Sequence, residues 1–260
     1  MNSKKIISII VLILISLIAI NNITTEYNNN QKRENILPTQ EVEIPEKEKE
    51  PVLEIPKEEV EEPVIEETEA DKINKLFSAD LNVAFAKEEF NNPDIVGRLE
   101  IPGLLNLIIT QSKNNDYYSN YNINRKKDIK GNEFLDYRNN ITDKQINIYG
   151  HNSRTFDIPF RKLENFLNTE FFNNNQYLIF QTDSVRRIYQ IVSIKKTGSD
   201  YSHMDLSPQN RYDHITKLTS NAINKRELPY NEDTNIIVLQ TCVEGQNGNY
   251  YIIVGFEIQF

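Results

Sequence analysis

The chain has 260 residues, of which 38% are hydrophobic and 26% charged, and a mean hydropathy of -0.56. A mean this low is typical of a folded domain joined to a polar segment that does not fold. Residues 31–70 contain fourteen Glu, five Lys or Arg, and five of the ten Pro. Residues 71–260 carry 22 basic and 23 acidic side chains, so charge gives no indication of nucleic-acid binding.

The N-terminus carries an apolar run over residues 6–20, which can be extended to Ile23, preceded by Lys4 and Lys5. The run is short for a membrane span of about 20 residues. A cleaved secretory signal and a buried core helix are therefore alternatives to an uncleaved signal anchor. The two lysines favour a cytoplasmic N-terminus. We expect residues 1–23 to be a single-pass anchor in the cell membrane, with the rest of the chain extracellular.

Residues 24–70 are predicted to be a disordered, acidic linker rich in Pro and Glu. Repeated Pro with Glu runs between them favours an extended, self-repelling chain. The simplest interpretation is a tether that holds a domain away from the membrane. Binding of a specific partner is the alternative, although no recognition motif indicates one.

Residues 71–260 are predicted to form the folded domain. Helical spacing of apolar residues predicts a helix over residues 71–90, ended by Asn91, Asn92 and Pro93. Eight short runs typical of β-strands follow, with turn residues between them, and they indicate a closed β-barrel or a sandwich. The runs are residues 95–101, 104–110, 133–137, 145–149, 177–181, 187–195, 235–241 and 250–258.

Two further helices are predicted between the strands. Residues 156–167 place their large apolar side chains on one face. Residues 208–224 have Ser207 as the expected N-cap and Pro208 at the first helical position. Their apolar stripe consists of Tyr212, Ile215, Leu218 and Ile223.

Cys242 is the only cysteine. A lone thiol in an exported protein cannot form an intrachain disulfide and is open to oxidation, so its presence needs a reason. A buried, inert thiol is one interpretation. Cys242, however, ends an apolar run and precedes a polar loop, residues 243–249, which predicts a thiol at the mouth of a strand where a substrate can reach it.

A nucleophilic cysteine needs a partner that exchanges its proton, and histidine suits this role near neutral pH. His203 lies in an expected loop and His214 in an expected helix, so both are interpreted as ordinary surface or helix-packing residues. His151 follows the strand-like run 145–149 and opens a loop. It can therefore meet Cys242 across neighbouring strands.

Several stretches are similar to successive signatures of one family. They are Ile95-Val96-Gly97, Gln111, Asn115-Asp116-Tyr117-Tyr118, Phe134-Leu135-Asp136-Tyr137-Arg138-Asn139, Ile148-Tyr149-Gly150-His151-Asn152 and Leu239-Gln240-Thr241-Cys242. In their order and separation they resemble the sortases, specifically class B, over residues 71–260. The helix predicted over residues 208–224 fits the class B form of the barrel.

The resemblance implies a mainly β fold, a closed eight-stranded barrel with an N-terminal helix and a helix between the late strands. It implies a membrane-anchored cysteine transpeptidase on a Gram-positive-type cell surface. Such enzymes cut the C-terminal sorting signal of a secreted protein after Thr, hold the acyl group as a Cys thioester, and pass it to an amine of a peptidoglycan precursor or a pilin. No metal or cofactor is implied.

By this resemblance Cys242 is the nucleophile and His151 is the general acid and base. The residues expected to bind substrate flank these two positions in the sequence. They are Tyr149, Asn152, Arg154, Gln240 and Thr241.

Two positions depart from the family. Gln240 stands where Ser is common, and residues 243–260 contain no Lys or Arg, although sortases carry an Arg there that steadies the substrate and the developing oxyanion. Matching residues 250–254 to the usual Arg-Ile-Val-Val pattern places Tyr251 near the missing Arg. Tyr251 is therefore the expected donor to the oxyanion, with Arg154 as the second candidate. The alternatives are a degenerate domain that binds sorting signals without efficient turnover, and a non-enzymatic anchored surface module.

Overall fold

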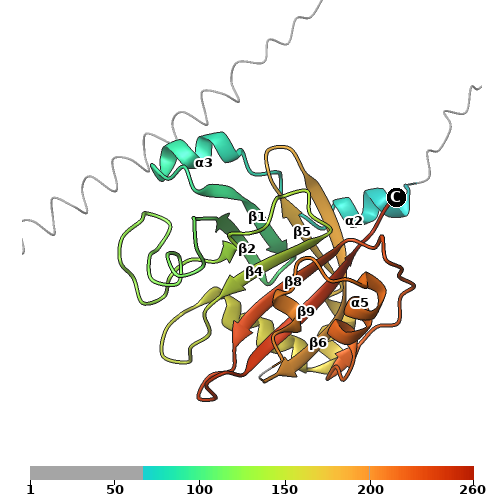
Figure 1. Ribbon diagram of the computed structural model, residues 1–260. Helices are drawn as coiled ribbons and strands as arrows, with labels where there is room; N and C mark the ends of the chain where they lie inside the picture. The colour runs from blue at the N-terminus through green and yellow to red at the C-terminus, as the bar shows by residue number, and fades with distance from the viewer. Residues whose placement is uncertain (1–66, 199) are drawn as a thin grey trace, which may run out of the picture. The chain divides into compact units, whose positions relative to one another are not determined.

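The computed structural model describes residues 67–198 and 200–260 (Figure 1). The anchor predicted over residues 1–23 and nearly all of the linker predicted over residues 24–70 lie outside the described residues. Within the described part of the chain, none of the helices combines the length and the apolar character that crossing a membrane requires.

The centre of the fold is a closed β-barrel. Its strands are β1 (Ile95–Ile101), β2 (Leu105–Thr110), β3 (Phe134–Leu135), β4 (Gln145–Gly150), β5 (Tyr177–Gln181), β6 (Arg186–Thr197), β8 (Ile236–Cys242) and β9 (Tyr250–Glu257). They follow the order β5-β1-β2-β3-β4-β8-β9-β6, and pairing of β6 with β5 closes the ring. The predicted closed eight-stranded barrel is confirmed. The two-residue strand β7 (Asn224–Lys225), which the sequence did not predict, adds to the edge of β6.

Both faces of β8 are buried along most of its length, which is why its sequence is a continuous apolar run. Ile237 and Leu239 belong to the large cluster inside the barrel. Ile236 and Val238 belong to a second cluster, in which helix α5 (Arg211–Thr219) contributes Ile215. In Figure 1, α5 lies beside β6 and β9, outside the barrel.

The single helix predicted over residues 71–90 is wrong, because the chain forms α2 (Glu69–Asn74) and α3 (Val83–Glu89) with an irregular segment between them. Long-range hydrogen bonds hold that segment. Arg98 of β1 donates to two of its backbone carbonyls, and Gln181 of β5 bonds both the N–H and the carbonyl of Leu81. Asn82 then caps α3 by accepting from the Phe85 N–H at 3.0 Å.

The helix predicted over residues 208–224 is shorter than expected. It begins at Arg211, and its N-cap is Asn210, whose Oδ1 accepts from the Asp213 N–H at 2.9 Å, so Ser207 is not the cap. Two members of the expected stripe, Tyr212 and Ile223, are each 51% exposed.

The region predicted as a helix over residues 156–167 is the 3₁₀ helix η1 (Pro159–Leu167), which begins at the proline. A short helix after it, α4 (Thr169–Asn174), was not predicted. A second 3₁₀ helix, η2 (Ser202–Met204), lies between β6 and α5.

Candidate active site

Cys242 and His151 lie at the same end of two adjacent strands. Strands β4 and β8 are parallel neighbours, and their last registered pair is Gly150 with Thr241. The next residue of each chain segment is His151 on one side and Cys242 on the other. The register therefore brings together the two residues that sequence reasoning selected.

Both residues open into one pocket of about 320 Å³. Its walls come from the loops before β3, the ends of β4, β8 and β9, and η2. The lining residues are Asn115, Asp116, Ser119, Phe134, Tyr149, Gly150, His151, Met204, Gln240, Cys242 and Tyr250. No Lys or Arg occurs among these lining residues of the described chain. Negative charge that develops at Cys242 is therefore not met by a Lys or Arg side chain of this lining.

The His151 ring is fixed by a backbone contact. Its Nε2 lies 2.7 Å from the carbonyl oxygen of Ser119. A carbonyl oxygen only accepts, so Nε2 carries the hydrogen and Nδ1 is the basic nitrogen of the neutral ring. Gly131, at φ +63°, lies behind the ring, where an added Cβ would stand 3.2 Å from Cδ2 of His151 and 2.4 Å from the carbonyl oxygen of Tyr118. The close approach requires glycine at that position.

The Cys242 side chain is exposed at the rim of the pocket. Neighbouring atoms nevertheless desolvate the sulfur, and this burial raises the pKa of the Cys242 thiol above its ordinary value. The thiol is therefore protonated at neutral pH. Attack on a carbonyl needs a base beside it, and His151 is the basic residue of the pocket.

Asn152 ties together the two loops that carry the pair. Its Nδ2 donates to the carbonyl oxygen of Cys242 at 2.8 Å and to Oε1 of Glu164 at 2.7 Å. Arg154 forms an ion pair with Glu244, with Nε 3.0 Å from Oε2. Neither Asn152 nor Arg154 lines the pocket. Both were expected to contact substrate. In the structure, their side chains join the β4–η1 loop to the β8–β9 loop.

Of the other three residues predicted to bind substrate, two line the pocket and one does not. Tyr149 and Gln240 line the pocket. Thr241 is 1% exposed and its Oγ1 donates to the carbonyl oxygen of Gly150 at 2.9 Å. Thr241 therefore connects β8 to β4 and does not face the pocket.

The structure places Tyr250, and not Tyr251, beside Cys242. Strands β8 and β9 are antiparallel, with Cys242 opposite Tyr250 and Thr241 opposite Tyr251. Side chains of directly opposed residues share a face, and a shift of one residue moves a side chain to the other face. Tyr250 lines the pocket. Tyr251, which was expected to donate to the oxyanion, is not among the residues that line the pocket.

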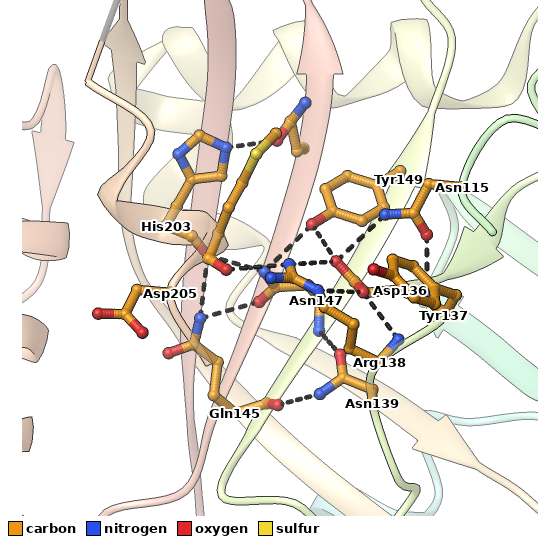
Figure 2. Close-up of polar contacts among 12 residues, drawn as sticks. Asn115, Asp136, Tyr137, Arg138, Asn139, Gln145, Asn147, Tyr149, His203 and Asp205 are labelled. Carbon is orange, nitrogen blue, oxygen red and sulfur yellow. Dashed lines mark hydrogen bonds and ion pairs between the residues drawn. The ribbon is translucent and has the colours of Figure 1, made fainter. Parts of the chain in front are cut away.

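A buried polar network under the pocket was missed by sequence reasoning (Figure 2). Asp136 is fully buried and accepts from Tyr149 at 2.8 Å and from two nitrogens of Arg138 at 2.9 and 2.8 Å. Burial acts to raise the pKa of Asp136, but the hydrogen bonds from Arg138 and Tyr149 outweigh it and leave that pKa below its ordinary value. The carboxylate is therefore ionised and anchors the network.

This network holds η2 against β4. Arg138 donates to the Met204 carbonyl oxygen at 2.9 Å, and Gln145 and Asn147 donate to that of His203 at 3.0 and 2.7 Å. His203 was expected to be an ordinary surface or helix-packing residue, but it is fully buried beside the pocket. The sequence analysis singled out the stretch Phe134 to Asn139 as a family motif. It did not predict that this stretch would belong to the network that holds η2 against β4.

The structure thus combines a closed eight-stranded barrel with a Cys–His pair at the ends of two parallel strands. No family model matches the chain. It is 28% identical over 157 residues to sortase B of Listeria monocytogenes, covering 58% of this chain and 63% of that protein, which is less than two thirds of its length. It is 29% identical over 170 residues to sortase B of Staphylococcus aureus, covering 61% and 67%.

Solved structures show the same likeness. The X-ray structure of Clostridium perfringens sortase B superposes with a TM-score of 0.62 at 27% identity, covering 68% of this chain and 99% of that one. Sequence and fold together support a class B sortase.

Proposed function

We propose that the chain is a sortase-type cysteine transpeptidase. It cleaves the C-terminal sorting signal of a secreted protein after Thr and transfers the acyl group, through a thioester on Cys242, to an amine of a peptidoglycan precursor or a pilin. The observation that carries the proposal is the placement of Cys242 and His151 side by side at one pocket. Structures of the same fold include a Staphylococcus aureus sortase B–substrate complex, a sortase B complexed with triglycine, and a Streptococcus pyogenes class B sortase involved in pilus biogenesis.

The proposed reaction has two halves. In the first, His151 takes the thiol proton, the Cys242 sulfur bonds to the carbonyl carbon, and the carbonyl electron pair moves onto oxygen. Collapse of this intermediate breaks the C–N bond, and His151 returns the proton to the leaving amine. In the second half an incoming amine attacks the thioester, the C–S bond breaks, and the amine proton passes through His151 back to the thiol.

The membrane is the proposed location of this reaction. Residues 1–23 would anchor the chain, with the acidic segment over residues 24–70 as a spacer and the barrel outside the cell. The support is the apolar run after Lys4 and Lys5 and the charge of the spacer. This arrangement would bring the pocket to secreted substrates.

One observation favours a second candidate function. The pocket contains no Lys or Arg among its described lining residues, and a charged donor to the oxyanion contributes strongly to acyl transfer. A degenerate domain that binds sorting signals without efficient turnover would have such a pocket. Binding of a sorting peptide without amine-dependent product would identify it.

The test is transfer of sorting-signal peptides to triglycine by the full-length chain, followed by product analysis. Product should require both the amine and Cys242, so Cys242→Ala abolishes it. His151→Ala should lower the rate by about 10² to 10⁴-fold. The matched control is His214→Gln, which lies in α5 and keeps a donor for Gln145. Turnover that survives His151→Ala but is lost in the control would contradict the assignment.

A further inference from the structure

Gln240 is a pocket residue that the proposed mechanism leaves without a role. It precedes Cys242 by two residues on β8, so the two side chains share a face of the strand, with Cα atoms about 6.7 Å apart. Both line the pocket, and Gln240 is only 8% exposed. A polar side chain this buried needs hydrogen-bond partners.

One end of the Gln240 amide is bonded to His203. Nε2 of His203 lies 2.5 Å from Oε1 of Gln240. Among the described residues the NH₂ group at the other end of the amide makes no hydrogen bond. Nδ1 of His203 has no partner within hydrogen-bond geometry, although the backbone carbonyl of Asp200 lies near enough to raise the pKa of the ring. The NH₂ group is thus an unused pair of donors on a buried side chain of the pocket.

The hydrogen-bond pattern fixes which way the amide points. Burial lowers the pKa of His203, so the ring is neutral and has one N–H. If Nε2 carries the hydrogen, it donates to Oε1, and the unpartnered Nδ1 is only a lone pair. If the amide were reversed, Nδ1 would carry the hydrogen, and the Asp200 carbonyl near it lies outside hydrogen-bond geometry, so this buried N–H would be poorly satisfied, which proteins rarely tolerate. The network therefore assigns the NH₂ group to the pocket side.

The His203 ring is itself held in place. Its backbone carbonyl accepts from Gln145 and Asn147 of β4, as Figure 2 shows. The ring centroid lies 6.2 Å from that of Tyr250 and 6.5 Å from that of Tyr201. A donor supported by such contacts is preorganised, which is what stabilisation of a transient charge requires.

We propose that the Gln240 NH₂ group, oriented by His203, donates the hydrogen bond that stabilises the oxyanion formed at Cys242. The inference rests on the proposed function, because it concerns the same intermediate. Gln240 is then a catalytic residue and His203 a positioning residue that acts through it. A neutral N–H donor takes the part that the missing cation would otherwise play.

The test compares two reactions of the only cysteine in the full-length chain. Acetylation by p-nitrophenyl acetate passes through a tetrahedral oxyanion, whereas alkylation by iodoacetamide does not. Cys242→Ala supplies the background rate for each. Gln240→Leu should slow acetylation by about 10²-fold and leave alkylation at the wild-type rate. The matched control is Gln190→Leu, a half-buried glutamine of β6 outside the pocket, which should change neither rate.

A double-mutant cycle tests the role of His203. His203→Phe keeps a ring and removes the donor, so acetylation should fall while alkylation does not. The double variant His203→Phe/Gln240→Leu should be no slower than Gln240→Leu alone, because His203 acts only through the amide. If Gln240→Leu fails to fold, Gln240→Glu keeps the acceptor for His203, removes the NH₂ group, and should lose acetylation at least as strongly.

Parallel losses in both reactions, wild-type acetylation in Gln240→Leu or Gln240→Glu, or additive losses in the cycle would overturn the inference. The proposed function is judged separately by transfer of a peptide acyl group to triglycine. Transfer by wild type that Gln240→Leu leaves unchanged overturns this inference alone. Dependence of acetylation on Gln240 without any peptide transfer contradicts the proposed function alone.

Discussion

Tyr250 stands directly opposite Cys242, and its ring packs 6.0 Å from that of Tyr201. Burial raises the pKa of Tyr250, so its hydroxyl stays protonated and can donate. Loss of one such neutral hydrogen bond costs about 1 kcal/mol, so Tyr250→Phe should slow acyl-enzyme formation up to about tenfold. Tyr251→Phe, on the other face of β9, should react like wild type.

Quenched-flow mass spectrometry of both variants with one sorting peptide measures these rates. A slow Tyr251→Phe beside a normal Tyr250→Phe would show that the strand register does not decide which tyrosine serves the pocket.

Glu133 is a buried carboxyl next to the site. It is 6% exposed, and its Cγ would lie 3.0 Å from a Cβ added at Gly150, the residue before His151. Burial raises the pKa of Glu133 to about 7, although backbone N–H groups of Glu133 and Phe160 oppose the shift. The folded protein therefore holds this proton more tightly than the unfolded chain does.

The sign of the pH effect follows from that shift. The stability contributed by protonated Glu133 is fully present below the unfolded pKa of about 4.5 and is lost as pH rises through about 7. Glu133→Gln should not show this loss of stability. The difference in free energy of unfolding, variant minus wild type, should therefore rise by about 2–3 kcal/mol between pH 5 and pH 8. Urea titrations at both pH values measure it, and a constant difference would contradict the burial argument.

At the scale of elements, two loops hold Cys242 and His151 in register. Asn152 bonds both Glu164 and the Cys242 carbonyl. Asn152→Ala should lower the free energy of unfolding by about 1 kcal/mol and slow acyl transfer about tenfold, because the Cys242 backbone loses its tie.

Thr155→Ala is the matched control, since Thr155 is an exposed residue of the same loop. Thermal melting and acyl-transfer rates compare the two variants. Equal behaviour of Asn152→Ala and Thr155→Ala would refute the role given to this tie.

The strands were predictable because their signal is local. Residues 95–101 and 177–181 are short runs typical of β-strands with turn residues between them, and β1 and β5 have those bounds. The break between α2 and α3 was not predictable, because Arg98 and Gln181 impose it from distant strands. Local spacing favours a continuous helix there, and tertiary hydrogen bonds override it.

In the candidate site, too, some features were predictable from the sequence and others were not. Cys242 and His151 were predictable from strand ends, since parallel strands that end together bring their next residues together. The choice between Tyr250 and Tyr251 depends on a register of one residue, which no local pattern fixes. His203 lies in a polar stretch that reads as a loop, and only long-range bonds from β4 bury it.

For the whole molecule, the N-terminal end of α2 indicates where the folded domain begins. Thr68 caps α2, and it forms a capping box with Asp71. A domain boundary at residue 71 would remove this cap. We therefore expect a fragment of residues 67–260 to unfold with the free energy of the full chain, and a fragment of residues 71–260 to be less stable by about 1 kcal/mol.

Urea unfolding of the three chains tests this. Loss of folding in the fragment of residues 67–260 would show that the preceding segment contributes to the core, contrary to our expectation of an anchor and a spacer.

The central claim is that Cys242 carries the acyl group. The most direct measurement is the intact mass of the full-length chain after brief incubation with a sorting-signal peptide and acid quenching, followed by peptide mapping. We predict a mass increase equal to the peptide portion ending at Thr, located on Cys242, which disappears when triglycine is added before quenching. An acyl adduct on another residue, or product formed without any adduct on Cys242, would contradict the account.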